Sequence, residues 1–168
     1  QKNTNCKNNI HLDGGIKTDR SIYNVPNKNK IILYAGTIGG HGGLLNLIKA
    51  FSYVKDKNVE LWICGKGKCK EIQNYVDQDV RIKFLGFVSQ KRLEKLCNNA
   101  DIFINPRENK VNNTNFPSKI LFYLSFIKPI ISTNSGLSPK YYDIIFLLND
   151  EKIETLTNKI YEVLSLTS

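Results

Sequence analysis

Ser118 and Lys119 follow Pro117 at the point where the stretch NPRENKVNNTNFPSKILFY (residues 105–123) changes from a polar loop to a helical pattern. Proline suits the first turn of a helix, so we expect a helix that starts at Pro117 and holds Ser118 and Lys119 in its first turn. Free N–H groups point outward there, and the helix dipole favours an anion. Phe122 lies one turn further along the same face. These residue types predict a phosphate site beside an apolar ring, and the alternative is an ordinary helix start with a surface lysine.

The glycine-rich stretch GTIGGHGG (residues 36–43) lies between an apolar run and a helical pattern. Glycines in that position let backbone N–H groups approach a phosphate at the start of a helix. The stretch is not a Walker loop, because no Gly-Lys-Ser/Thr follows, and it does not match G-x-G-x-x-G. His41 could contact a phosphate from this loop or have no task there. A plain turn at a strand end explains the glycines equally well.

Two further loops follow predicted strands. In CGKGKCK (residues 64–70), Lys66 could face an anion, although a solvated turn is the better interpretation, and Gly65 could leave room for a ligand. In LGFVS (residues 85–89), the main chain could bind a flat ring. Glu108 is the only acid close to Ser118 and Lys119 in the sequence. The sequence shows no Ser-His-Asp or Cys-His arrangement, no paired carboxylates and no set of residues at metal-ligand spacing.

Short apolar runs alternate with helical patterns along the chain. Ser89 and Asp150 are expected to cap two of the helices. Short buried strands that alternate with amphipathic helices predict an α/β fold, a Rossmann-like parallel sheet with helices on both faces. Ligands bind at the carboxyl ends of the strands in such a fold, and the four loops lie there. The expected strands cover residues 31–35, 59–64, 82–85, 101–105, 129–133 and 144–148, and the expected helices lie over 44–54 and 69–75, from 89, from 117 and after 150.

The composition bounds the class of protein. The chain has 168 residues, of which 41% are hydrophobic, and this fits one globular domain. No apolar run approaches the roughly 20 residues that cross a bilayer. The net charge of +9 fits a codon bias toward Asn, Lys and Ile better than nucleic-acid binding. The four cysteines form no C-x-x-C pair, which favours a reducing, cytosolic setting.

The domain boundaries follow from the change in pattern near residue 31. Residues 1–30 are polar and are expected to form a lead-in segment or hinge, and residues 31–168 are expected to form one Rossmann-like domain. The chain contains no Met, so we expect it to be one domain of a longer protein.

Four segments in this order resemble the C-terminal domain of GT-B glycosyltransferases. They read ILYAGTIGGHGGLLNLIKAF, ELWICGKG, RIKFLGFVSQKRLEKLCNNADIFINPR and FPSKILFYLSFIKPIIST. The likeness extends from about Ile31 to Leu164, and it is nearest to the retaining enzymes of the group 1 or family 4 type, which use nucleotide sugars for bacterial surface polysaccharides. Each segment is weak evidence alone, and the specificity comes from their order and spacing.

The resemblance implies the donor-binding half of an enzyme that transfers a hexosyl group from a UDP- or GDP-sugar to a polysaccharide or glycolipid acceptor. The diphosphate would lie against Ser118, Lys119 and the loop 36–43, the base against the main chain of 86–88, and the sugar near Glu108 or Thr114. The donor-binding positions that it implies are Gly36, Thr37, Gly39, Gly40, His41, Gly65, Lys66, Phe87, Val88, Glu108, Thr114, Ser118, Lys119 and Phe122.

The resemblance also bears on partners and setting. It implies an N-terminal domain, absent from this chain, that binds the acceptor and supplies the catalytic residue, so this chain alone is expected to be inactive. It implies a nucleotide sugar as substrate, no cofactor and no metal. The setting would be cytoplasmic, and the whole protein could lie at the inner face of the membrane.

Five positions depart from the family pattern. Thr37 stands where the family often has arginine, and His41 stands where it often has lysine. Phe122 replaces a glutamate that binds the ribose hydroxyls, Thr114 replaces an acid near the sugar, and Ile127 replaces a glycine. A hydroxyl without its carboxylate loses a charge-assisted hydrogen bond that contributes about 1.5–3 kcal/mol. Donor binding is therefore expected to be weak, altered or lost, unless another acid substitutes.

Alternatives remain open at this point. Glu108 or a group from the missing domain could substitute for the lost carboxylate. The chain could be a degenerate, non-catalytic glycosyltransferase-like domain, or a nucleotide-sugar 2-epimerase of the same fold. A basic module that binds nucleic acid ranks last, because no stripe of basic and aromatic residues is present.

Overall fold

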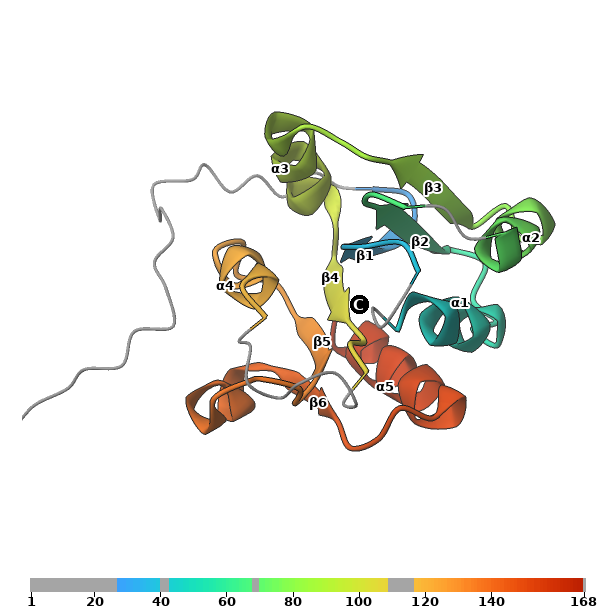
Figure 1. Ribbon diagram of the computed structural model, residues 1–168. Coiled ribbons are helices and arrows are strands. Elements are labelled where there is room, and N and C mark those ends of the chain that lie inside the picture. Colours follow the sequence, from blue (N-terminus) through green and yellow to red (C-terminus); the bar gives the residue numbers. More distant parts are fainter. Residues whose placement is uncertain (1–26, 40–42, 68–69, 109–116, 168) are drawn as a thin grey trace, which may run out of the picture.

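A computed structural model describes residues 27–39, 43–67, 70–108 and 117–167, and its centre is a six-stranded parallel sheet with the order β3-β2-β1-β4-β5-β6. Figure 1 shows helices on both sides of this sheet, as the sequence predicts. The strands are β1 (Lys30–Ala35), β2 (Val59–Cys64), β3 (Ile82–Gly86), β4 (Ile102–Asn105), β5 (Ile130–Thr133) and β6 (Phe146–Leu148). The helices are α1 (Leu44–Ser52), α2 (Lys70–Gln78), α3 (Gln90–Asn99), α4 (Lys119–Leu124), the 3-10 helix η2 (Pro139–Ile144) and α5 (Ile153–Leu166).

The apolar runs form parallel strands because helices cover both of their faces. In β1, Ile32 and Tyr34 belong to the core on one face, and Ile31 and Leu33 belong to the core on the other. The first core is closed by α1, α2 and α5, and the second by α3, α4 and the segment around η2 (Figure 1). The two cores leave the loops at the ends of the sheet as the places where polar chemistry can gather.

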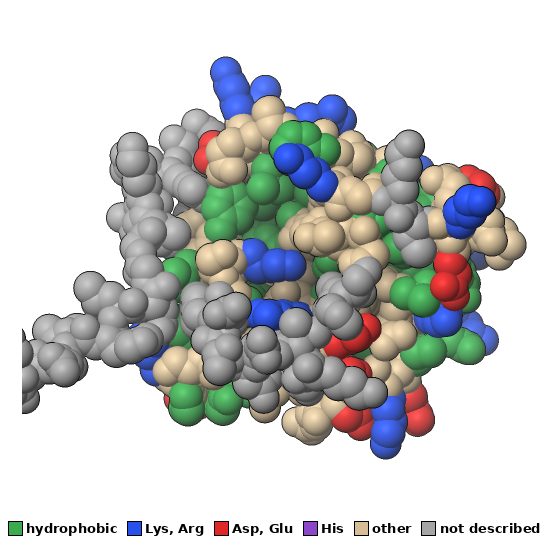
Figure 2. All heavy atoms as spheres, in the orientation of Figure 1, with side chains coloured by type: hydrophobic (Ala, Val, Ile, Leu, Met, Phe, Trp, Pro, Cys, Tyr) green, Lys and Arg blue, Asp and Glu red, His purple; other side chains and the backbone are tan. Residues whose placement is uncertain are grey.

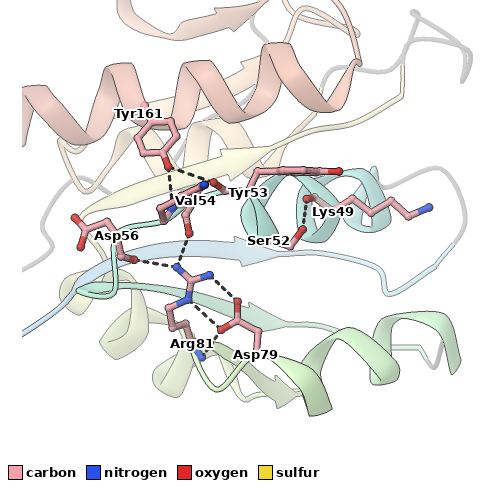
Figure 3. Close-up of polar contacts among 9 residues, drawn as sticks. Lys49, Ser52, Tyr53, Val54, Asp56, Asp79, Arg81 and Tyr161 are labelled. Atoms are coloured by element: carbon pink, nitrogen blue, oxygen red, sulfur yellow. Dashed lines mark hydrogen bonds and ion pairs between the residues drawn. The ribbon is translucent and has the colours of Figure 1, made fainter.

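Arg81 joins the two loops that lead into β2 and β3. Its guanidinium forms an ion pair with Asp79 at 2.7 Å and donates to the carbonyl oxygens of Val54 and Asp56 (Figure 3). It also lies 4.9 Å from the ring centroid of Phe51. The hydrogen bonds from Arg81 hold the pKa of the Asp79 carboxyl below its usual value. This cluster ties the loop before β2 to the loop before β3.

Several element boundaries differ from the predicted ones. The helix expected over 69–75 runs over Lys70–Gln78, and the strand expected over 144–148 is shortened to Phe146–Leu148 because a 3-10 helix occupies 139–144. The prediction that Asp150 caps the last helix is wrong. Lys152 is the N-cap of α5, and Asp150 Oδ1 accepts a hydrogen bond from the backbone N–H of Lys152 at 3.0 Å. Ser89 caps α3 as expected, through a bond of 3.4 Å from the N–H of Arg92.

The fourth helix also starts later than expected. Its first residue is Lys119, with Ser118 as N-cap, and the carbonyl of Pro117 accepts from Ile120 N–H in a tight turn before it. The helix has six residues, so its dipole is small, and any anion at this point depends on side-chain charge.

Candidate functional site

A cavity of about 460 Å³ opens at the carboxyl ends of β1, β2 and β3. Parallel α/β sheets bind ligands at this edge, and the volume lies within the range of small-molecule pockets. Figure 2 shows hydrophobic side chains beside Lys or Arg side chains in a hollowed part of this face. The lining residues are Ala35, Gly36, Thr37, Cys64, Gly65, Lys66, Phe87, Val88, Gln90, Leu93, Ser118, Lys119, Phe122 and Tyr123.

Lys119 is the charged group at the base of this cavity. Its Nζ lies 5.1 Å from the centroid of the Tyr34 ring, and a Cβ on Gly36 would lie only 2.8 Å from that nitrogen. Burial, and then the positive charge of Arg107, lower the pKa of Lys119 to about 8. A cation held in this way gains from a bound anion, which would restore its charge.

The loop after β1 is fixed by the loop after β2. The N–H of Gly36 donates to the carbonyl of Cys64 at 2.9 Å, and the N–H of Ile38 donates to the carbonyl of Lys66 at 2.7 Å. These two amides are therefore occupied, although glycine loops of this kind were expected to offer their amides to a phosphate. Anion binding within the described part of this loop has to rely on its other groups and on Lys119.

The structure requires a glycine at position 65 for a reason that differs from the expected one. A Cβ at this position would lie 1.6 Å from the carbonyl oxygen of Gly36, and its φ is 157°. The room that Gly65 leaves is filled by the backbone of the neighbouring loop, so loop packing requires this glycine. Gly65 still lines the cavity beside Lys66.

The outer rim of the cavity carries an exposed aromatic ring. Phe87 is 69% exposed, and Lys66 Nζ lies 4.6 Å from its ring centroid. Gly86 precedes it with φ 67°, and the carbonyl of Gly86 accepts from the N–H of Gly65 at 2.9 Å. The left-handed glycine turns the chain so that Phe87 and Val88 face the cavity mouth.

Phe122 forms an apolar wall. Its ring packs edge-on against Phe126, with centroids 5.3 Å apart, and lies 6.4 Å from the ring of Tyr123. The hydroxyl of Tyr123 is held by the backbone of Ala35, accepting from its N–H at 2.9 Å and donating to its carbonyl at 3.4 Å. Neither ring offers an acceptor to a ligand, because Phe122 has no polar atom and the Tyr123 hydroxyl already has two partners.

The cavity brings together nine of the fourteen predicted donor-binding positions. These are Gly36, Thr37, Gly65, Lys66, Phe87, Val88, Ser118, Lys119 and Phe122. Gly39 and Glu108 are described but do not line the cavity, so the expectation that Glu108 faces the bound sugar finds no support in the cavity lining. Gly40, His41 and Thr114 lie outside the described residues.

Some residues at the site were missed by the sequence reasoning. Tyr123 lies four residues after Lys119, the helical spacing that brings two side chains to one face, so it could have been found. Arg107 follows the end of β4 closely, at the edge where ligands bind, and this place was a usable signal. Gln90 and Leu93 enter the cavity from α3, and no local pattern marks them.

The chemistry of the lining is cationic and apolar. None of the described residues that line the cavity is an acid, and the same part of the chain holds no group of three or more His, Cys, Asp or Glu placed to bind a metal ion. Burial raises the pKa of Cys64 to about 11, so its thiol stays protonated at neutral pH. Among the described residues, no helix has the length and apolar character needed to cross a membrane. The arrangement suits binding of an anion joined to a flat or apolar group.

Comparisons with known proteins place these features in a family. The family model described as "Glycosyl transferases group 1" matches residues 29–165. Among curated protein sequences, none matches this chain.

Solved structures with a similar fold include two that the chain covers almost end to end. The C-terminal domain of a glycosyl transferase group 1 family protein from Francisella tularensis has a TM-score of 0.72 at 18% identity, over 90% of this chain and 88% of that one. The catalytic domain of cholesterol-alpha-glucosyltransferase from Helicobacter pylori has a TM-score of 0.65 at 20% identity, over 81% and 86%. The lipopolysaccharide outer core galactosyltransferase WaaB has a TM-score of 0.72 at 19% identity, over 92% of this chain and 46% of its own.

Proposed function

From the premise that this chain belongs to the group 1 glycosyl transferases, we propose that it is the half of such an enzyme that binds the nucleotide sugar. The observation that carries the proposal is Lys119, a partly buried cation at the base of a cavity at the carboxyl edge of the sheet. Arg107 lies close enough to lower its pKa further, so two positive charges act on one place. A diphosphate is the anion that suits such a pair.

The rest of the cavity suits a nucleotide that extends outward from Lys119. The diphosphate would lie between Lys119, Ser118 and Thr37. The base would lie at the mouth, where the main chain of residues 86–88 and the exposed Phe87 ring meet. In transfer, the diphosphate leaves with the electrons of the glycosidic bond, and a fixed cation stabilises the charge that develops on it.

The sugar, the acceptor and the catalytic group complete the proposal. We propose a UDP- or GDP-linked hexose as the donor and a polysaccharide or glycolipid as the acceptor. The acceptor site and the catalytic residue would lie in an N-terminal domain that packs over this cavity, with residues 1–30 as the hinge. The similar structures include a lipopolysaccharide galactosyltransferase and a cholesterol glucosyltransferase, which act on lipid-linked or lipid acceptors by their names.

Calorimetric titration of the 168-residue chain with UDP, GDP and their hexose conjugates tests donor binding. We expect one nucleotide to bind, and Lys119→Ala to weaken that binding at least tenfold, because a charge-assisted bond to phosphate is lost. Lys57→Ala is the matched control, because this exposed lysine lies in the loop before β2, at the opposite edge of the sheet. Equal losses in both variants would show that only net charge matters and would contradict a site at Lys119.

Phe122 favours a second candidate function, a glycosyltransferase-like domain that no longer turns over a donor. The described residues that line the cavity include a phenyl ring and no carboxylate, so they offer a ribose no charged acceptor. If no nucleotide binds to a chain that circular dichroism shows to be folded, this second candidate is the correct one and the first is wrong.

A further inference from the structure

The cavity has two chemically different ends that lie one helical turn apart. Lys119 and Phe122 are three residues apart on α4, so their Cβ atoms are about 5–6 Å apart. The first carries the charge and the second carries an apolar ring. Phe87, Val88 and Phe122 line the same cavity as Lys119. A nucleotide with its phosphates at Lys119 and its base at residues 87–88 would therefore place its pentose where Phe122 can form the wall.

The surroundings of that pentose are largely apolar. Val88 and Leu93 line the same cavity and pack against the same core as Phe122. Apart from Lys66 and Lys119, the described lining residues carry no ionic side chain, and one of the polar ones, Gln90, already donates its amide N–H to Glu94 at 3.2 Å. A pentose hydroxyl buried against Phe122 would lose its bonds to water, and none of the described lining residues offers it a carboxylate in exchange.

We propose that this site binds 2′-deoxyribonucleoside diphosphates, and the sugars linked to them, at least as tightly as the ribo forms, with Phe122 as the residue that sets this preference. The inference rests on the proposed function, because it takes a nucleoside diphosphate as the ligand. The deoxy form has one hydroxyl fewer to desolvate, and its C2′ methylene can pack on the phenyl ring.

The test compares matched pairs by calorimetry, UDP against dUDP and GDP against dGDP, so that base and charge are the same within a pair. For the wild-type chain we expect the deoxy form to bind equally well or up to about tenfold more tightly. In Phe122→Glu the ribo form should become favoured by about tenfold, because the new carboxylate accepts from the 2′-hydroxyl. The ratio of the two affinities is the readout, since the added negative charge acts on both members of a pair.

Phe122→Leu is the control that keeps the wall apolar, and it should leave the ratio as in the wild type. Circular dichroism and melting curves check that each variant folds. A wild-type chain that binds ribo forms tenfold more tightly than deoxy forms would overturn this inference and leave the proposed function standing. A folded wild-type chain that binds none of the four nucleotides would overturn the proposed function and this inference with it.

Discussion

The ionisation of Lys119 should make the affinity for a nucleotide depend on pH. Burial and Arg107 lower the pKa of Lys119 to about 8, and a bound diphosphate would raise it again. Below pH 8 the free site carries the ammonium that the anion needs, and above pH 8 a proton has to be taken up on binding. We expect affinity for the bound nucleotide to fall by up to tenfold per pH unit above pH 8, measured by calorimetry from pH 7 to pH 9.5.

Lys119→Arg separates this cause from the ionisation of the ligand. A guanidinium stays protonated over the whole range, and a terminal phosphate completes its ionisation near pH 6. The variant should therefore bind with an affinity that does not change between pH 7.5 and pH 9.5. A fall above pH 8 that persists in Lys119→Arg would assign the titration to another group.

Ile127 holds a backbone conformation that suits glycine. Its φ is 53°, and its side chain is 84% exposed, so strain is present without compensating burial. A β-branched residue in this region costs about 1–2 kcal/mol. Ile127→Gly is expected to raise the free energy of unfolding by about 1 kcal/mol in urea denaturation, while Ile127→Ala should gain less. A loss of stability in Ile127→Gly would mean that the exposed side chain makes contacts that compensate for the strain.

The sequence predicted residues best where a local rule applied. Ser118, Lys119 and Phe122 were singled out because a proline marked the helix start and helical spacing put them on one face, and all three line the cavity. Glycine was expected at 127 only from the family pattern, and the positive φ supplies its physical reason. Gln90 and Leu93 reach the cavity from α3, and their place depends on how that helix packs on the sheet, so no local pattern could reveal them.

At the scale of elements, two glycines of the adjacent loops differ in the space that a side chain would find. A Cβ on Gly65 would overlap the Gly36 carbonyl at 1.6 Å, whereas a Cβ on Gly39 would meet no atom within 4 Å. Both have positive φ, at 157° and 91°. Gly65→Ala should lower the free energy of unfolding by about 3 kcal/mol or more, because backbone has to move, and Gly39→Ala by about 1 kcal/mol from strain alone. Urea denaturation of the two variants measures the difference, and similar losses would show that the loops are free to separate.

Strands were more predictable than the segments that join them. Residues 31–35 of β1 form a continuous apolar run because both faces of the strand are buried, and β2 is apolar except for Glu60. The predicted bounds of these two strands differ from the observed ones by at most one residue. The strand expected over 144–148 loses its first residue, Ile144, to the 3-10 helix over Pro139–Ile144, and Asp150 lies too early to cap α5. Short helical turns and caps depend on where the chain meets the next element, which hydrophobic periodicity does not encode.

At the scale of the whole molecule, the fold class was predictable because alternating strands and helices allow few arrangements in a parallel sheet. Because the strands are parallel, the stabilising cluster of Arg81, at the amino ends of β2 and β3, and the cavity of Lys119, at the carboxyl ends of the strands, lie at opposite ends of the sheet. Stability and binding should therefore respond to different residues.

Arg81→Ala removes the ion pair with Asp79 and leaves the carbonyl of the buried Val54 without its guanidinium donor. We expect the free energy of unfolding to fall by about 2–3 kcal/mol, which is a fall of about 5–10 °C in Tm for a chain of this size, with nucleotide affinity at 15 °C unchanged.

Lys119→Met should have the opposite pattern of effects, a loss of binding without a loss of stability. Because burial disfavours its ammonium at neutral pH, the methionine variant should melt at the same or a higher temperature and bind nucleotide at least tenfold more weakly. Paired calorimetric and melting measurements on both variants would show this, and a loss of affinity in Arg81→Ala at 15 °C would mean that the two ends of the sheet are coupled.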